Sequence, residues 1–270
     1  MPRKPRMAIG VFDSGVGGLS VLRHIREVLP NERLIYVADS GHVPYGDKPA
    51  SYIEQRSLAL TRFLIEQGAE AIVIACNTAT AAAAAMLRRH FRLPIVAMEP
   101  AVKPAVAATK SGVVGVLATT GTLESARFAA LLERYAGEVQ IITRGCPGLV
   151  EQVECGNLAG TETRELILRY TAPLLAQGAD TLILGCTHYP FLAPLITEVV
   201  GDAITLVDTG AAVAQQLHRR IRSELPARLP GMVPSAQFWT SGDAGQSSRI
   251  MSVLWGEDIV VQRLPEGGEE

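Results

Sequence analysis

Short apolar runs alternate with longer stretches of helical periodicity along the chain. In the first third, short apolar runs lie within residues 7–12, 33–38 and 71–75, the last of them continuous, and each is followed closely by a polar residue. Runs of this length are typical of strands buried on both faces of a parallel sheet. Between them, residues 51–67 carry apolar side chains at helical spacing, and the alanine-rich residues 78–90 favour a helix.

The second half of the chain repeats this alternation. Apolar runs at residues 113–117, 139–142 and 181–184 predict three further strands. Residues 125–135 and 163–177 have helical periodicity and lie between those runs. Strands that alternate with helices in this way predict an α/β fold with parallel sheets.

One phrase of the sequence occurs twice. Residues 67–78 read QGAEAIVIACNT, and residues 177–188 read QGADTLILGCTH. In both copies a turn signal and an apolar run precede a cysteine, which is Cys76 in the first copy and Cys186 in the second. The repeat predicts two similar α/β domains related by internal duplication. We expect mostly parallel sheets flanked by helices, with an active site in the cleft between the domains.

The predicted domains are not both continuous in sequence. Residues 98–104 contain two prolines and are suited to a crossover between the halves. Residues 237–264 contain further strand and helix patterns, which we expect to rejoin the first half. The first domain would then comprise residues 1–98 plus 211–270, and the second domain residues 99–210.

The composition is that of a globular protein. Of 270 residues, 48% are hydrophobic and 19% charged, and the formal net charge of −2 gives no indication of nucleic acid or of an anionic membrane surface as a partner. No apolar run approaches the roughly 20 residues of a membrane-spanning helix. The basic residues near the start are not followed by a signal-peptide core, because Asp13 and several glycines interrupt the apolar run. We therefore expect a cytoplasmic protein.

The chain has four cysteines, too few for a disulfide framework in a protein of this length. They show neither C-x-x-C spacing nor the cysteine and histidine spacing of a zinc site, so no metal is expected. Cys146 and Cys155 lack a polar context after a buried strand, and we interpret them as structural.

Cys76 and Cys186 each follow a predicted buried strand and precede a predicted helix. The partial positive charge at a helix N-terminus favours the thiolate form of a nearby cysteine. The alternative is that each thiol is a small buried apolar group, which is common for free cysteine. The matched pair in matched polar surroundings favours catalysis, and His188 beside the second thiol is placed to act as its base or acid. Asn77 or Thr78 is the predicted cap of the helix after the first thiol.

A glycine-rich loop follows the first predicted strand. Residues 13–18 read DSGVGG, and Asp39 ends the second strand, where the ribose partner of a dinucleotide would lie. The spacing is not G-x-G-x-x-G, and Asp13 would oppose a pyrophosphate. Its carboxylate suits an ammonium group or a neighbouring thiol better, and helix capping is the structural alternative. In the longer loop of residues 41–47, backbone N–H groups around Tyr45 could bind a carboxylate.

Motifs for common cofactors are absent from the sequence. It contains no P-loop, and none of its four lysines lies where a pyridoxal Schiff base would be expected. If the protein labilises a C–H bond, we expect it to do so without a cofactor.

At these motifs the chain resembles the glutamate racemases of the cofactor-independent aspartate/glutamate racemase superfamily. The matching phrases are GVFDSGVGG at residues 10–18, DSGHVPYG at 39–46, ACNTA at 75–79 and GCTHYP at 185–190. They span most of the chain in the order found in that family. The resemblance implies interconversion of L- and D-glutamate, which supplies D-glutamate for peptidoglycan, and a homodimer.

The resemblance also implies roles for individual residues. Cys76 and Cys186 would be the acid/base thiols on opposite faces of the substrate Cα, with Asp13 assisting the first and His188 the second. A family glutamate that follows a Cys-Pro motif corresponds to Glu154. The implied substrate-binding residues are Asp13, Ser14, Tyr45, Gly46, Asn77, Thr78, Thr187 and His188.

Three other functions remain open from the sequence. An aspartate or hydantoin racemase would share the fold and both thiols. A non-catalytic amino-acid-binding protein would share the two lobes but would not need two matched cysteines. A nucleotide-dependent enzyme would use the glycine-rich loop of residues 13–18.

Overall fold

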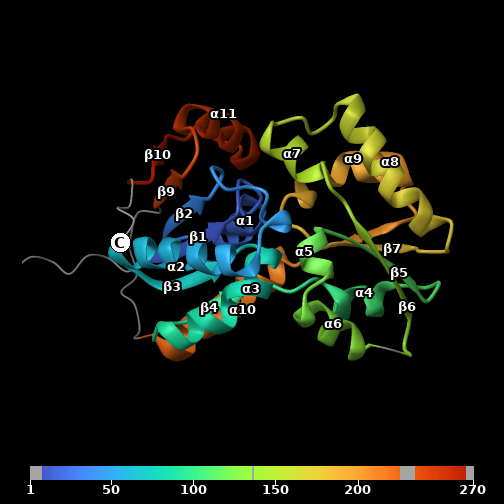
Figure 1. The fold of residues 1–270 in the computed structure, drawn as a ribbon, viewed down its shortest axis with the longest axis horizontal. Coiled ribbons are helices and arrows are strands. Elements are labelled where there is room, and N and C mark those ends of the chain that lie inside the picture. Colours follow the sequence, from blue (N-terminus) through green and yellow to red (C-terminus); the bar gives the residue numbers. More distant parts are fainter. Residues whose placement is uncertain (1–7, 136, 226–234, 266–270) are drawn as a thin grey trace, which may run out of the picture.

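The chain forms two parallel β-sheets, each covered by helices on both faces (Figure 1). The structure is a computed structural model that describes residues 8–135, 137–225 and 235–265. Met7, which the sequence placed at the start of the first strand, lies outside the described residues. The expected fold class, two α/β units with parallel sheets flanked by helices, is confirmed.

The larger sheet has six strands in the order β10-β9-β2-β1-β3-β4, and every pairing is parallel. The predicted tail strand pairs with β2 and thereby returns the end of the chain to the first sheet. The strands are β1 (Ala8–Asp13), β2 (Arg33–Ala38), β3 (Ala69–Ile74), β4 (Ile95–Ala97), β9 (Ser235–Thr240) and β10 (Val261–Arg263).

The smaller sheet has four strands in the order β6-β5-β7-β8, again all parallel. Its strands are β5 (Val113–Ala118), β6 (Gln140–Gly145), β7 (Thr181–Leu184) and β8 (Thr205–Val207). The strands β2-β1-β3-β4 of the larger sheet follow the same order as the four strands of the smaller sheet. In this comparison β1 corresponds to β5, β2 to β6, β3 to β7 and β4 to β8. This shared topology is what an internal duplication would produce.

Helices separate successive strands in both halves. In the first half they are α1 (Leu19–Val28), α2 (Ala50–Glu66) and α3 (Asn77–His90), and in the second half α4 (Val102–Ala108), α5 (Thr120–Leu123), α6 (Ala126–Glu133), α7 (Leu149–Glu154), α8 (Thr161–Leu175) and α9 (Ala193–Val200). The helices α10 (Gly210–Glu224) and α11 (Ala244–Trp255) belong to the last part of the chain, and both contact α1.

Several short elements were not predicted from the sequence. The strands β4 and β8 have only three residues each, which is too short for a periodicity to show. The helix α7 follows a glycine with a φ of 90°, and its six residues are too few for a helical periodicity to show. The helix α5 has only four residues, and Thr119 caps it.

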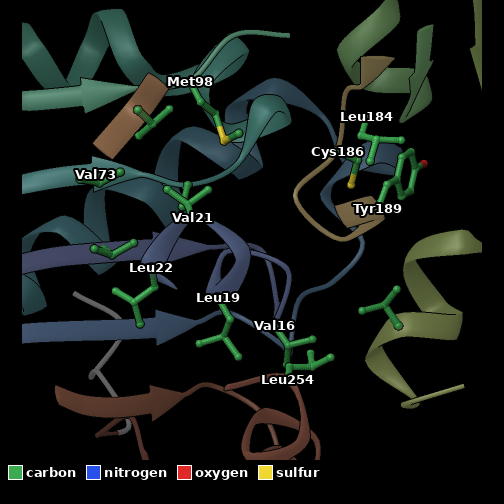
Figure 2. Close-up of a cluster of buried hydrophobic side chains, with 14 of the residues drawn as sticks. Val16, Leu19, Val21, Leu22, Val73, Met98, Leu184, Cys186, Tyr189 and Leu254 are labelled. Carbon is green, nitrogen blue, oxygen red and sulfur yellow. The ribbon is translucent and has the colours of Figure 1, made fainter. Parts of the chain in front are cut away.

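The apolar core is continuous from one sheet to the other. On the first sheet it includes Leu19 and Leu22 of α1, and on the second it includes Leu184 and Tyr189, all of them at most 5% exposed. Figure 2 shows these side chains on either side of the region where the two sheets approach each other, with Cys186 at its edge. The packing of apolar side chains therefore holds the two units together as well as each sheet to its helices.

The strands of the larger sheet lie within residues 8–97 and 235–263, and those of the smaller sheet within residues 113–207. The limits of the two domains, residues 1–98 plus 211–270 and residues 99–210, stay a prediction. Within the described residues, no helix is long and apolar enough to cross a membrane.

Two glycines occupy corresponding positions in the central strands and let a helix approach each sheet closely. A Cβ atom on Gly10 of β1 would lie 3.0 Å from Cβ of Leu64 in α2. A Cβ atom on Gly115 of β5 would lie 2.9 Å from Cδ1 of Leu174 in α8. These separations are shorter than ordinary van der Waals contact, so an added methyl group would displace the helix or the side chain.

We expect Gly10→Ala and Gly115→Ala each to lower the free energy of unfolding by about 1–3 kcal/mol, because they overpack a buried contact. Gly245→Ala is the matched control, since its added Cβ would meet nothing closer than 3.4 Å in a helix, where alanine is favoured. Urea denaturation of the three variants measures the effect. Equal stability of Gly10→Ala and Gly245→Ala would contradict the close-approach interpretation.

Candidate active site

A pocket lies where the carboxyl ends of strands from both sheets face each other. In open α/β sheets this edge is where ligands bind. The free volume of this pocket is about 10 Å³, room for about one water molecule, so a larger ligand needs the lining residues to move apart. It is lined by Ser14, Pro44, Tyr45, Gly46, Cys76, Asn77, Thr78, Thr119, Thr122, Val150, Gly185, Cys186, Thr187 and His188.

Cys76 lies between the end of β3 and the start of α3, and its side chain is 5% exposed. Its Sγ atom accepts a hydrogen bond from the backbone N–H of Ala79 at 3.4 Å and lies 3.8 Å from Oγ of Ser14. Cys76 is therefore the N-cap of α3, and the prediction that Asn77 or Thr78 caps this helix was wrong. The two polar residues instead form its first turn, where their side chains line the pocket.

Asp13, at the end of β1, is fully buried beside the first thiol. Its carboxylate accepts hydrogen bonds from the N–H groups of Ser14 (2.7 Å) and Gly18 (2.6 Å) and from the hydroxyl of Thr187 (3.2 Å). Burial raises the pKa of Asp13, and the charge of His188 and the Ser14 N–H only partly oppose this. The carboxyl group therefore holds a proton more readily than an exposed aspartate does.

Burial raises the pKa of the Cys76 thiol, and the negative charge of Asp13 raises it further. The hydrogen bond from Ala79 opposes both effects because it stabilises the thiolate. Cys76 is therefore protonated in the resting protein at neutral pH, and any thiolate there depends on transfer of its proton to a neighbour.

Cys186 occupies the matching position after β7, and its side chain is 7% exposed. No long helix follows it directly. A short 3-10 turn, Tyr189–Leu192, comes next, and Pro190 lies in its first turn. Its Sγ atom lies 3.6 Å from Nδ1 of His188, so the second thiol has an imidazole as its neighbour where the first has a helix N-terminus.

His188 connects the second thiol to a carboxylate. Its Nε2 atom hydrogen-bonds to Oε1 of Glu154 at 2.6 Å. Burial lowers the pKa of His188, but the hydrogen bonds to Cys186 and Glu154 outweigh burial and raise it well above its ordinary value. The imidazole is therefore cationic at neutral pH, and its positive charge stabilises negative charge on the sulfur of Cys186.

Glu154, at the end of α7, reaches from the second sheet to the first. Its Oε1 atom also accepts a hydrogen bond from the backbone N–H of Val16 at 2.7 Å, and its Oε2 atom accepts one from Oγ of Ser40 at 3.1 Å. A Cβ atom on Gly15 would lie 1.9 Å from Oε1 of Glu154, and one on Gly17 would lie 2.3 Å from Nδ1 of His188. The glycines of this loop thus make room for side chains from the other half of the molecule.

The same contacts exclude the dinucleotide interpretation of residues 13–18. The space that a pyrophosphate would need beside the glycines is filled by Glu154 and His188. Asp39 is also not available to a ribose, because Arg56 donates to both of its carboxylate oxygens.

Tyr45 and Gly46 enter the pocket from the loop after β2. Tyr45 is 1% exposed, and its hydroxyl donates to Oδ2 of Asp39 at 2.5 Å. Gly46 packs against the second half, where a Cβ atom on it would lie 3.1 Å from Cβ of Thr119.

Asn77 provides the clearest unoccupied hydrogen-bonding capacity in the pocket. Both its Oδ1 and Nδ2 atoms are buried, and neither has a hydrogen-bond partner among the described residues. Buried amide groups are almost always paired, so these atoms are suited to a polar ligand. Neighbouring Thr78 differs, because its hydroxyl hydrogen-bonds to that of Thr119 at 2.9 Å.

The predicted site lacks five residues that line the pocket, which are Pro44, Thr119, Thr122, Val150 and Gly185. A signal for the threonines was present. When the repeat is aligned on Gly10 and Gly115, Thr119 falls at the position of Ser14, directly after the central strand. Among the described residues, no group of three or more histidine, cysteine, aspartate or glutamate side chains could hold a metal ion.

The pH dependence of stability tests the contact between His188 and Glu154. A histidine whose pKa is raised by folding stabilises the fold fully below about pH 6.5 and loses this contribution as the pH rises toward the folded-state pKa. Glu154→Gln removes the carboxylate that helps to raise the pKa. We expect the free energy of unfolding of the wild type to fall by about 1 kcal/mol more than that of Glu154→Gln between pH 6 and pH 8.

Urea denaturation at pH 6, 7 and 8 measures how the free energy of unfolding of each protein changes with pH. This range avoids most ionisation of the thiols. Parallel pH profiles of the two proteins would show that Glu154 does not control the protonation of His188.

The chain is similar to known proteins over nearly its whole length. A sequence model of the Asp/Glu/Hydantoin racemase family matches residues 9–217. The glutamate racemase of Ectopseudomonas mendocina is 61% identical over 255 residues, which cover 94% of this chain and 96% of that protein. A glutamate racemase isoform from Bacillus anthracis has a TM-score of 0.86 at 30% identity over 96% of this chain and 98% of that one.

The Escherichia coli glutamate racemase, solved in complex with L-glutamate and the activator UDP-MurNAc-Ala, has a TM-score of 0.85 at 33% identity. It covers 96% of this chain and 98% of its own. The resemblance seen in the sequence motifs is thereby confirmed, and the chain belongs to the Asp/Glu/hydantoin racemase family.

Proposed function

We propose that this protein is a glutamate racemase that interconverts L- and D-glutamate without a cofactor and so supplies D-glutamate for peptidoglycan. The observation that carries the proposal is the pair of buried thiols, Cys76 and Cys186, which come from corresponding strand ends of the two halves and line one pocket. Relatives that are 55–61% identical over nearly the whole chain are named glutamate racemases.

Racemisation needs a base on one face of the substrate Cα and an acid on the other. One thiolate removes the Cα proton, and the opposite thiol delivers its own proton to the other face, so the substrate neither gains nor loses a proton overall. The reverse reaction needs the reverse protonation pattern, and both thiols must therefore exchange protons between turnovers.

The two thiols have different partners for this exchange. Asp13, whose raised pKa favours a proton on its carboxyl group, is suited to exchange a proton with Cys76. His188, held cationic by Glu154, is suited to return a proton to Cys186. A buried site of this kind also excludes water, which strengthens each electrostatic interaction around the weakly acidic Cα proton.

The remaining pocket residues are suited to hold the substrate. The unpaired amide of Asn77 and the hydroxyls of Ser14, Thr78 and Thr187 offer hydrogen bonds to carboxylate and ammonium groups. Backbone N–H groups at Tyr45 and Gly46 are suited to a carboxylate.

Two features favour this function over the alternatives. The family includes aspartate and hydantoin racemases, but near-full-length relatives are named for glutamate. A non-catalytic amino-acid-binding protein would have no use for two buried thiols with separate proton-exchange partners. The homodimer and the cytoplasmic location stay predictions, and light scattering of the purified protein would test the first.

We expect Cys76→Ala and Cys186→Ala each to lower the rate of racemisation by about 100-fold to 10,000-fold, which is the usual contribution of an acid or base. Cys155→Ala is the matched control, because Cys155 is exposed and does not line the pocket. Circular dichroism at a glutamate band follows the reaction without added cofactor.

The same assay in deuterated water tests the two-thiol route. The wild-type product enantiomer should carry deuterium at Cα before the remaining substrate does, because acid and base lie on opposite faces. Full racemisation by either single alanine variant would rule out the mechanism.

A further inference from the structure

A second buried carboxylate lies beside the active site and takes no part in the proton transfers. Asp39 follows β2, is 0% exposed, and donates its backbone N–H to the carbonyl of Asp13 at 3.0 Å. It therefore sits next to a proposed catalytic carboxyl group, at the same edge of the sheet. A buried carboxylate needs charged or hydrogen-bonding partners to offset its loss of hydration.

Arg56 of α2 is the main partner of Asp39. Its Nε atom donates to Oδ2 at 3.0 Å and its Nη2 atom to Oδ1 at 2.7 Å, which is the bidentate geometry specific to arginine. His42 lies farther away, with Nε2 at 4.0 Å from Oδ1. Burial lowers the pKa of His42, so this ring is neutral near pH 7 and Arg56 supplies the compensating charge.

The carboxylate of Asp39 connects Arg56 to the loop that lines the pocket. Oδ2 of Asp39 also accepts the hydroxyl hydrogen bond of Tyr45, and the carbonyl of Asp39 accepts the N–H of His42 at 2.8 Å. The loop that carries Tyr45 and Gly46 is thus fixed at two points to one residue. Its other side rests on the second half of the molecule, where Gly46 packs against Thr119.

We infer that Arg56 is a positioning residue for substrate binding. Arg56 does not line the pocket, and it acts through Asp39 on Tyr45 and thereby on the backbone N–H groups at Gly46. This role rests on the proposed function, in which those groups bind a substrate carboxylate. A shift of this loop would weaken binding of the substrate carboxylate. Both thiols and the groups that exchange protons with them would stay in place.

Two substitutions at Arg56 test the role. Arg56→Lys keeps the charge but loses the bidentate contact, and we expect it to raise KM for glutamate roughly tenfold, the cost of one charge-assisted hydrogen bond, with little change in kcat. Arg56→Met leaves the buried carboxylate unpaired, so its KM should rise further and thermal denaturation must show whether it folds. Arg62→Met is the control, because Arg62 is an exposed arginine of the same helix.

A double-variant comparison separates positioning from a general structural effect. Tyr45→Phe removes the hydroxyl that links the loop to Asp39, so its effect on KM and that of Arg56→Lys should overlap and not multiply. A KM equal to that of the wild type in Arg56→Lys, or effects that multiply, would overturn the inference while the proposed function stands.

Calorimetric titration with L-glutamate distinguishes a failure of the proposed function from a failure of the positioning role of Arg56. Wild-type protein that neither racemises nor binds glutamate would overturn the proposed function and the role of Arg56 with it. Wild-type protein that racemises, with weaker glutamate binding to Arg56→Lys alone and not to Arg62→Met, is the expected result.

Discussion

The carboxylate of Glu154 is the contact on which the arrangement of the site depends. It accepts hydrogen bonds from His188 in its own half and from Val16 and Ser40 in the other half. One side chain thus holds the imidazole beside the second thiol and links the two halves. Without it, the glycine-rich loop would face an unfilled space, and His188 would lose one of the two partners, Cys186 and Glu154, that raise its pKa.

The two halves of the molecule surround their buried thiols with different groups. Each must place a buried thiol at the carboxyl end of a parallel strand, where desolvation disfavours the thiolate. In the first half a helix N–H and a carboxyl group surround Cys76, and in the second half an imidazolium lies beside Cys186. The order of the strands is the same around both thiols, whereas the groups next to the two sulfur atoms differ, as the proposed action on a chiral substrate would require.

Sequence patterns predicted the parts of the structure that depend on burial along a single segment. The strand before Cys186 lies within the predicted limits of residues 181–184, and the family and fold class are confirmed. Contacts between segments that are distant in the sequence were harder to predict. Glu154 was identified only through the family resemblance, and Thr119 was not identified, because no local pattern shows which residues will meet across two sheets.

The thiol of Cys76 has a second role because it also caps helix α3. Under the two-thiol mechanism, the sulfur of Cys76 gains and loses negative charge in each turnover, and the hydrogen bond that it accepts from Ala79 strengthens and weakens with it. The residues of the first helical turn, Asn77 and Thr78, line the pocket. Under that mechanism, a change of charge on the sulfur would therefore reach, through one helical turn, the groups proposed to hold the substrate, and proton transfer would be coupled to binding and release.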